Sequence, residues 1–142
     1  MASALVDTGA VVALINRADR HHSAAIDWFS HFRGVLLTTE AVVTETAYVL
    51  AASLPHQRAA LLWFHRATTS GLLEVRPVQN YADVEAIVSR YAALPCDYAD
   101  ATLVALAEST KVNVIATVDQ RDFSVYRLGR RKRFRVVLGP DG

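Results

Sequence analysis

Short apolar runs alternate along this chain with longer segments of helical periodicity. Runs rich in Val, Ile and Leu occupy 3–6, 35–38, 72–76, 114–118 and 134–138. They do not alternate cleanly with polar residues, which is typical of strands buried on both faces. Apolar spacing predicts helices between them, over 9–16, 22–33, 40–53, 56–69, 81–93 and 98–110. We expect helix breaks at Pro55 and Pro95, because proline cannot continue a helix, and Asp97 as N-cap of the last helix.

The alternation of strand and helix predicts an α/β fold. We expect a central, mostly parallel five-stranded sheet that is flanked by helices on both faces. A chain of 142 residues fits one domain, which we place at 1–142. Ligands of such sheets bind outside the carboxyl ends of the strands, so side chains that directly follow a strand are the first candidates for a site.

Cysteine content and hydropathy bear on the compartment. The single cysteine, Cys96, excludes an internal disulfide and suggests a reducing environment, where it would serve as a small buried apolar residue. The apolar runs are far shorter than the roughly 20 residues that a membrane span requires. The first apolar stretch has no basic segment before it and contains an acid, unlike a secretion signal. We therefore expect a cytoplasmic protein that makes no membrane contact.

The net charge of +1 conceals an asymmetry. Residues 127–135 hold six of the 15 Lys and Arg residues and no acid, so the rest of the chain carries 9 basic and 14 acidic side chains. A basic segment on an acidic body suits a polyanion such as RNA. A solvated terminus would explain the same composition equally well. The residues expected to contribute to RNA affinity are Arg130, Arg131, Lys132 and Arg133.

Four acids stand where their surroundings are apolar. Asp7 follows the first predicted strand and Asp119 follows the fourth, which places both at the carboxyl edge of the sheet. Glu45 and Asp100 interrupt apolar helical faces, and no base lies within one helical turn of either. Taken singly, each acid could be a cap, a first-turn acid, an exposed helix residue or a turn former. Their joint placement favours a common site.

Four carboxylates in one pocket repel one another and stay ionised only beside a hard cation. All-oxygen ligands suit Mg²⁺, with Mn²⁺ as a substitute, and such an ion can activate a water and stabilise the leaving oxygen of a phosphodiester. Other chemistries fit less well. The five histidines lack the spacing of a zinc site, and the chain has neither a G-x-S-x-G elbow nor a phosphate-binding glycine loop.

Four motifs resemble the PIN-domain family, and in particular the VapC-type toxins of bacterial toxin–antitoxin pairs. They are VDTGAVVAL around Asp7, TETAYVL around Glu45, DYADATLVALAE around Asp100 and TVDQRDF around Asp119, and the resemblance runs from about residue 4 to residue 138. It implies a metal-dependent endoribonuclease that cuts RNA by attack of water, with these four acids at the family's acidic positions. Supporting roles fall to Thr8, Thr117, Asp122 and Asp97. Gly9 is a departure, since the family commonly has Ser or another small residue there.

The resemblance also implies a homodimer and a cognate antitoxin whose helix lies in a groove near the site. Segments 40–53 and 56–69 carry more apolar side chains than one buried face can use, which favours protein contacts unless these helices bury them against each other. These side chains are Val49, Leu50, Leu54, Leu61, Leu62, Trp63 and Phe64. Three alternatives remain. The first is an aspartate-based phosphotransfer domain, although Gly9 stands where such a domain needs its second Asp. The others are a solitary RNA-processing nuclease and a PIN fold that binds RNA or protein without cleaving.

Overall fold

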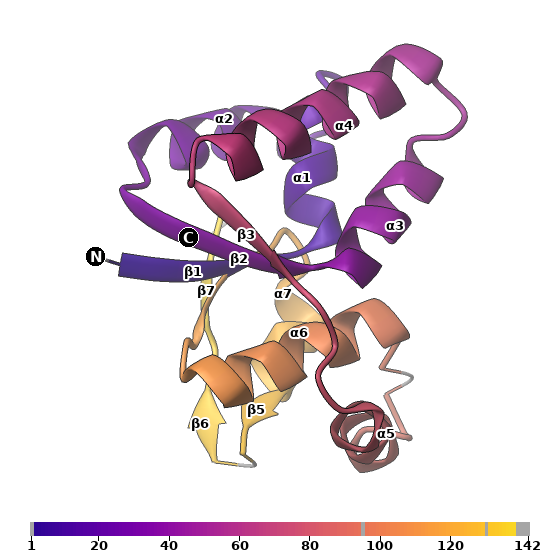
Figure 1. Ribbon diagram of the computed structural model, residues 1–142, viewed down its shortest axis with the longest axis vertical. Coiled ribbons are helices and arrows are strands. Elements are labelled where there is room, and N and C mark those ends of the chain that lie inside the picture. Colours follow the sequence, from indigo (N-terminus) through magenta and orange to yellow (C-terminus); the bar gives the residue numbers. More distant parts are fainter. Residues whose placement is uncertain (1, 95, 130, 139–142) are drawn as a thin grey trace.

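Five parallel strands form the central sheet of the molecule (Figure 1), in the order β3-β2-β1-β4-β7. The computed structural model describes residues 2–94, 96–129 and 131–138. The strands are β1 (Ala2–Val6), β2 (Gly34–Thr39), β3 (Leu73–Arg76), β4 (Val114–Ala116) and β7 (Arg135–Val137). In the central strand β1, Leu5 pairs with Leu37 of β2 on one side and with Ile115 of β4 on the other. The expected five-stranded sheet is confirmed, and every pairing in it is parallel.

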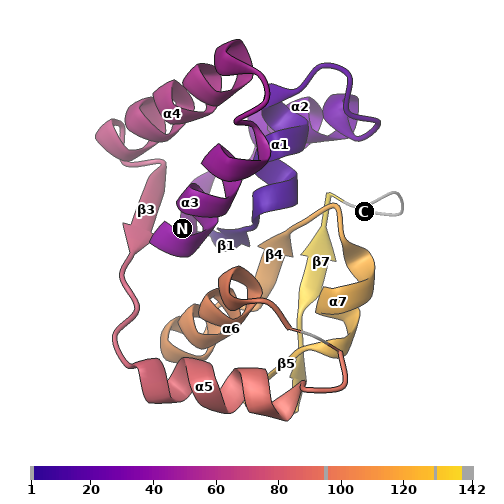
Figure 2. The same ribbon diagram turned by 90° about the vertical axis from the view of Figure 1, so that its right-hand side faces the viewer.

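Helices cover both faces of this sheet, as expected (Figures 1 and 2). They are α1 (Thr8–Ile15), α2 (His22–His31), α3 (Glu40–Val49), α4 (Leu54–Thr69), α5 (Tyr81–Arg90), α6 (Tyr98–Thr110) and α7 (Gln120–Val125). Helices α1, α2 and α4 lie on one face, and α5, α6 and α7 on the other. None of the helices within the described ranges is long and apolar enough to cross a membrane.

The core explains why the strands read as continuous apolar runs. In β1, Ala4 and Val6 pack into the cluster beneath α1, α2 and α4, whereas Leu5 packs into the cluster beneath α5 and α6. Successive side chains of a strand point to opposite faces, so a strand covered on both sides must be apolar at every position. Helix α3 serves both clusters, with Val42 in one and Val43 against the other.

Two helix boundaries differ from the sequence prediction because of proline and tyrosine. The predicted break between α3 and α4 is present, but α3 already ends at Val49 and α4 begins at Leu54, so Pro55 lies in the first turn of α4 and is not itself the break. A first-turn N–H has no partner within the helix, and proline loses nothing there. Helix α5 ends at Arg90 instead of residue 93, because the buried ring of Tyr91 turns out of the helix and packs on Tyr126. The second predicted break, Pro95, lies outside the described residues.

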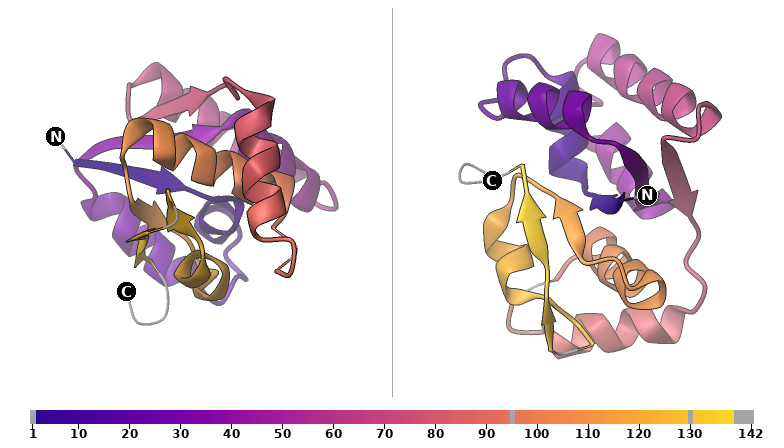
Figure 3. Two further views of the ribbon diagram at one scale, coloured as in Figure 1. Left: turned by 90° about the horizontal axis from the view of Figure 1, so that it is seen from below. Right: turned by 90° about the vertical axis from the view of Figure 1, so that its left-hand side faces the viewer.

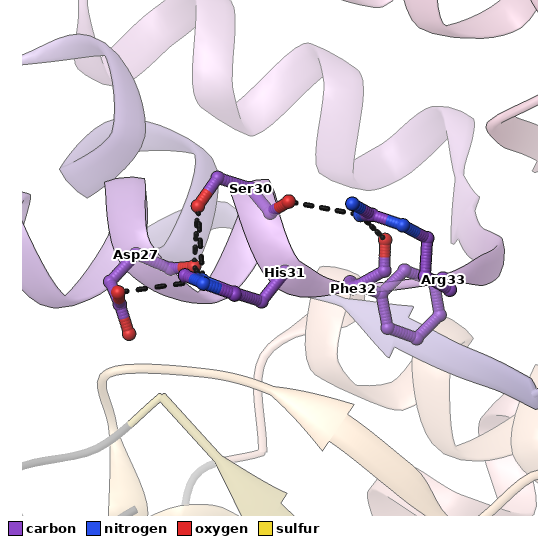
Figure 4. A network of polar contacts seen from close by, with 5 residues as sticks. All are labelled: Asp27, Ser30, His31, Phe32 and Arg33. Atoms are coloured by element: carbon purple, nitrogen blue, oxygen red, sulfur yellow. Dashed lines mark hydrogen bonds and ion pairs between the residues drawn. The ribbon is translucent and has the colours of Figure 1, made fainter.

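Helix α2 ends at His31, two residues earlier than predicted, in a network of side-chain contacts with backbone carbonyls (Figure 4). Ser30 Oγ donates to the Asp27 carbonyl at 2.8 Å, and the Arg33 guanidinium donates to the Ser30 carbonyl at 2.9 Å. The bond from Arg33 satisfies a carbonyl that the helix end leaves free. Strand β2 then begins at Gly34, whose φ is +148° and where a Cβ would lie 2.0 Å from the Ala2 carbonyl oxygen. Only glycine permits this close approach of β2 to β1.

The last third of the chain holds elements that the sequence pattern did not predict. Strand β4 ends at Ala116 instead of residue 118, and the short helix α7 follows it. A two-stranded antiparallel hairpin, β5 (Arg127–Leu128) and β6 (Lys132–Arg133), occupies most of the basic segment. Leu128 and Phe134 are buried and anchor this hairpin, so the segment is folded and is not a solvated terminus. Because Phe134 packs into the core beside the hairpin, β7 is shorter than the predicted 134–138.

Candidate active site

A pocket of about 290 Å³ at the carboxyl edge of the sheet brings the four predicted acids together. Seven of the chain's 14 acidic residues line it: Asp7, Asp19, Glu45, Asp97, Asp100, Asp119 and Asp122. No Lys or Arg is among its described lining residues. The four predicted acids follow β1 and β4 or lie in the first turn of α6 and in the middle of α3. The topology therefore concentrates negative charge at one place, where an ion or a charged ligand would have to balance it.

Asp7 is the most enclosed of these acids. It follows β1 directly and caps α1, where its Oδ1 accepts a hydrogen bond from the Ala10 N–H at 2.9 Å. The Thr117 hydroxyl donates to its Oδ2. Burial raises the pKa of Asp7 from 3.8 to about 7 against these two bonds, and the negative charges of Asp119 and Glu45 add to the rise. A carboxyl held in this state ionises readily only when a cation is at hand.

Asp100 occupies the first turn of α6, where Asp97 is the N-cap as predicted and accepts from the Asp100 N–H at 2.8 Å. Leu103 and Val104 on the same helix are fully buried. Burial raises the pKa of Asp100 to about 8, and repulsion from neighbouring acids, first Asp97 and then Asp7, contributes. The pocket therefore contains two carboxyls with raised pKa values, and they come from segments that are 93 residues apart in the sequence.

Glu45 and Asp119 complete the wall of the pocket and are less enclosed. Glu45 is half-buried on α3, and its helical face turns from the core at Val42 to solvent at Val49, which is 52% exposed. The expectation of an inward apolar face thus holds only for the first half of that helix. Asp119 is exposed and caps α7 by accepting from the Arg121 N–H at 3.2 Å. Thr117 and Val118 separate it from β4.

Two threonines flank the acids, at positions singled out from the sequence. Thr117 is fully buried, and its hydroxyl both donates to Asp7 and accepts from the Asp119 N–H at 2.9 Å, so one side chain connects two of the acids. Thr8 is buried on the pocket wall, and its Oγ1 is, within the described ranges, one of two buried side-chain polar atoms without a hydrogen-bond partner. Asp122 is half-buried nearby, and burial together with Asp119 raises its pKa.

The donor set fits a hard divalent cation in its chemistry. Every candidate ligand is a carboxylate or hydroxyl oxygen, the type that Mg²⁺ and Mn²⁺ prefer, and the unpartnered Thr8 hydroxyl is a further oxygen at the wall. Over the residues that the structure describes, no three acidic, histidine or cysteine side chains are close enough together to enclose an ion by themselves. Mg²⁺ does not require such a cage, since it keeps several waters and binds through one or two carboxylates.

Tyr126 belongs to the site but was not found from the sequence. It is fully buried at the end of α7, and its hydroxyl donates to Asp100 Oδ2 at 3.3 Å. Burial, with hydrogen bonding to Cys96 next, raises the pKa of Tyr126 well above its ordinary value, so it remains a donor. A tyrosine in a short polar segment carries no pattern that points to an acid 26 residues earlier. Cys96 is buried as predicted.

The basic residues predicted to bind RNA are not part of this pocket. Arg131, Lys132 and Arg133 are exposed on the β5–β6 hairpin, and Arg130 lies outside the described residues. The Gly129 N–H donates to Glu108 at 3.0 Å, which fixes the hairpin at the far end of α6 from Asp100. Eight residues of helix separate these two acids, a rise of about 12 Å.

The apolar surface expected on α3 and α4 is present in part. Tyr48, Val49, Leu54, Leu61 and Leu62 are exposed by 46–81%. Leu50 and Phe64 are buried, contrary to the expectation, because they turn inward and Phe64 packs into the core beneath α4. Trp63 is half-buried against Phe29 and Phe64.

Comparison with known proteins agrees with this architecture. The family model of the PIN domain matches residues 4–128. Ribonuclease VapC26 of Mycobacterium tuberculosis is 29% identical over 136 residues, which cover 94% of this chain and 98% of the relative. The crystal structure of Mycobacterium tuberculosis VapC20, described as a Sarcin-Ricin loop cleaving toxin, superposes with a TM-score of 0.67 at 24% identity, over 84% of this chain and 92% of that one. The chain therefore belongs to the PIN domain family, as its sequence motifs indicated.

Proposed function

We propose that this protein is a metal-dependent endoribonuclease that hydrolyses RNA phosphodiester bonds, with Mg²⁺ as its cofactor and Mn²⁺ as a substitute. The observation that carries the proposal is the convergence of Asp7, Glu45, Asp100 and Asp119 on one pocket. The raised pKa values of Asp7 and Asp100 show how strongly that pocket disfavours uncompensated negative charge. Family membership and the similarity to Ribonuclease VapC26 support the same reaction.

In this proposal Asp7 and Asp100 are the principal ligands of the cation, because they are the most enclosed of the four acids and the most perturbed. Glu45 and Asp119 contribute to its binding from the other walls of the pocket, directly or through water. A cation held by these acids would supply positive charge that makes an attacking water more acidic and stabilises the leaving oxygen of the cleaved phosphodiester.

The supporting residues orient these ligands. Thr117 fixes Asp7 through its hydroxyl and holds the Asp119 backbone through the same oxygen, so we assign it a positioning role. Asp97 sets the first turn of α6 and thereby places Asp100. Thr8 and Asp122 lie at the wall, where their oxygens can hydrogen-bond to water around the ion. Each of these side chains positions an acid or binds water, and none of them is itself a ligand of the cation.

We further propose that the protein is the toxin of a type II toxin–antitoxin pair and acts on RNA in the cytoplasm. The support is its similarity to two VapC proteins, one named a ribonuclease and the other described as a toxin. A solitary RNA-processing nuclease would use the same site. A small neighbouring gene that encodes a DNA-binding protein would favour the toxin, and its absence would favour the processing enzyme.

The exposed apolar side chains of α3 and α4 support partner contacts. Leu54 and Leu62 line, with Pro55 and Arg58, an open pocket of about 300 Å³ on this surface. Exposed apolar side chains that cluster on neighbouring helices commonly mark protein contacts. We assign this surface to the homodimer and to an antitoxin helix, and light scattering at micromolar concentration would show whether the protein alone is a dimer.

The proposal is tested by incubating the purified protein with pooled cellular RNA in Mg²⁺ and in EDTA, and by mapping the new 5′ ends. We expect cleavage at defined positions in Mg²⁺ and none in EDTA. Asp27→Asn serves as the matched control, because it removes an exposed acid on α2 that lies outside the pocket. Equal cleavage in EDTA, or no cleavage in Mg²⁺, would contradict the proposal.

A further inference from the structure

The β5–β6 hairpin carries a concentrated positive charge that the proposed cleavage site does not use. Arg131, Lys132, Arg133 and Arg135 are exposed, and Lys111 is exposed beside them at the end of α6. We call these five residues the basic surface. Lys111 and Lys132 line one open pocket together with Leu128, Gly129 and Glu108, whose carboxylate pairs with Arg90 at 3.1 Å. Among the residues with described positions, none of the five forms an ion pair.

The basic surface is held on a folded support. Leu128 and Phe134 are each 7% exposed and join the core cluster beneath α5 and α6. The Asn113 amide donates to the Arg133 carbonyl at 3.2 Å, which fixes the second strand of the hairpin to the start of β4. Arg127 has a different role: its guanidinium donates to three carbonyls at the end of α7, at 2.7 to 3.0 Å, so it stabilises that helix end.

The separation between the basic surface and the acid pocket follows from the lengths of two structural elements. Along α6, Asp100 and Glu108 are eight residues apart, which is about 12 Å. Along β4, Asn113 beside the hairpin and Thr117 beside Asp7 are four residues apart, which is about 13 Å in a strand. Figures 1 and 3 show the hairpin at the other end of the α6 layer from the edge where α1 and α3 begin. The two sites therefore occupy opposite edges of the sheet.

We propose that the basic surface is a second RNA-binding surface, which holds the phosphate backbone of a long or folded RNA while the bond to be cut lies in the acid pocket. This inference rests on the proposed function and adds the class of substrate. A backbone that joins the two sites must cover at least about 12–13 Å, so it must contain several phosphates. A dinucleotide is too short to reach both, so the enzyme would discriminate by the size of its RNA.

The charge distribution also predicts that RNA binding does not wait for the metal, whereas cleavage does. The ionised acids around the pocket repel a phosphate backbone until a cation is bound, whereas the basic surface attracts it at all times. RNA binding through the hairpin is therefore independent of divalent metal, and only cleavage requires it. The basic side chains belong to one short hairpin and its immediate neighbours, and this arrangement suits the repeating charges of a phosphate backbone. An acidic protein segment is the competing occupant.

The test measures RNA binding in EDTA by fluorescence anisotropy, at several salt concentrations, with two probes. One probe is an RNA stem-loop with about ten base pairs in the A-form, which is long enough to span both sites, and the other is a dinucleotide, which is not. The test variant is Arg131→Ala/Lys132→Ala/Arg133→Ala. The matched control is Arg17→Ala/Arg33→Ala/Arg66→Ala, which removes three exposed charges from the opposite side of the sheet. A third variant, Arg131→Lys/Arg133→Lys, keeps the charge of the hairpin.

We expect the wild-type protein, the control and the lysine variant to bind the stem-loop in EDTA with similar affinity. The alanine variant should bind it about tenfold more weakly, and the slope of log affinity against log salt should decrease by about two to three, one unit for each lost phosphate contact. Binding of the dinucleotide, which carries one phosphodiester, should be weak and should change little between variants. At saturating stem-loop and Mg²⁺, the alanine variant should cleave at the wild-type rate.

The inference fails if the alanine variant binds the stem-loop with wild-type affinity and salt slope, or if wild type binds it only in Mg²⁺. It also fails if the alanine substitutions weaken binding of polyglutamate and leave RNA binding unchanged, because the surface would then be a contact for an acidic protein. These outcomes are separate from failure of the nuclease proposal, in which wild type would bind the stem-loop in EDTA and never cut it in Mg²⁺. Thermal unfolding of each variant verifies the fold, and the lysine variant remains informative if the alanine variant is unstable.

Discussion

The acid pocket and the basic hairpin lie at opposite ends of α6 and hold their charges in opposite ways. In the pocket, Asp7 is 6% exposed, and each of its oxygens has a hydrogen-bond donor. On the hairpin, Arg131, Lys132 and Arg133 are exposed to solvent, and their side chains can move freely in water. Repulsion between the acids therefore destabilises the metal-free protein, and a bound cation would relieve it. The positive charge of the hairpin attracts anions from solution, and salt screens this attraction.

This contrast predicts different responses to substitution. In the pocket, the charges are coupled through low-dielectric surroundings, so that removal of one acid alters the ionisation of the others. On the hairpin, exposed charges act almost independently, and their effects should add and decline with salt. The four predictions that follow test the pocket side of the comparison, which carries the larger effects.

The largest effect is expected from Asp7→Asn, which keeps the shape of the side chain and removes its charge. Cleavage should fall by about a thousand-fold or more, because the amide cannot hold the cation that activates water. Asp27→Asn should leave the rate unchanged. Turnover should be measured at limiting Mg²⁺ under single-turnover conditions, and wild-type turnover of Asp7→Asn would show that Asp7 is not a principal ligand.

The stability of the metal-free protein should decrease as pH rises from about 5 to about 8. The pKa of Asp7 is 3.8 in its ordinary state and about 7 in the fold, and that of Asp100 is about 8, so the folded state binds these protons more tightly. Their contribution to the free energy of unfolding is complete below about pH 4 and disappears as pH passes through 7 and 8.

Thermal unfolding in EDTA measures this decrease. In Asp7→Asn the pH dependence should be weaker, and the variant should be more stable than wild type at about pH 8, because one repulsive charge is gone. Mg²⁺ should restore wild-type stability at high pH, since it binds the ionised carboxylates of the folded state. A metal-free stability that rises with pH over this interval would contradict the electrostatic description of the pocket.

A smaller effect is expected from Tyr126→Phe, which removes the hydroxyl that donates to Asp100. The ring stays packed against Tyr91 and Phe123, so the fold should persist. We expect about a tenfold loss of kcat, equal to one charge-assisted hydrogen bond, together with a rise in the pH at which activity reaches half its maximum. Tyr91→Phe is the matched control, because its hydroxyl accepts from the Arg127 N–H and does not contact an acid. Equal losses in both variants would reduce Tyr126 to a packing role.

The smallest effect is expected from Gly9→Ala, at the position that departs from the family pattern. A Cβ at Gly9 would lie 2.8 Å from Val118 Cγ2, so the half-buried Val118 side chain must shift. We expect a loss of about 1 kcal/mol in the free energy of unfolding. The double variant Gly9→Ala/Val118→Ala should recover most of this lost stability. Chemical denaturation measures the free energy of unfolding of the single and the double variant. No recovery would mean that the helix backbone, and not Val118, resists the added methyl group.

The sequence predicted the fold where local pattern and tertiary burial agree. Continuous apolar runs gave the five strands, because a parallel sheet covered on both faces leaves no position for polar side chains. The pattern placed the start of α4 at residue 56 instead of Leu54, since a proline reads as a break although it fits the first helical turn. It missed α7 and the hairpin because these elements are too short to show a periodicity.

The acids could be found from the sequence, but their surroundings could not. Asp7 and Asp100 were recognisable because a charged residue at a buried position needs a reason. Tyr126 has no such signal, since a buried tyrosine is ordinary in a core and its hydrogen bond to Asp100 exists only through the fold. The basic cluster was visible as charge, but its distance from the pocket depends on the contact between Gly129 and Glu108.

The most direct test of the central claim is to locate bound metal in the folded protein. Crystals soaked in Mn²⁺ should give an anomalous scattering peak in the pocket, in contact with carboxylate oxygens of Asp7 or Asp100, and the peak should vanish in Asp7→Asn. The same Mn²⁺ concentration should support cleavage of RNA in solution. Absence of a peak in the pocket at a concentration that supports cleavage, or a peak bound elsewhere in the molecule, would contradict the account.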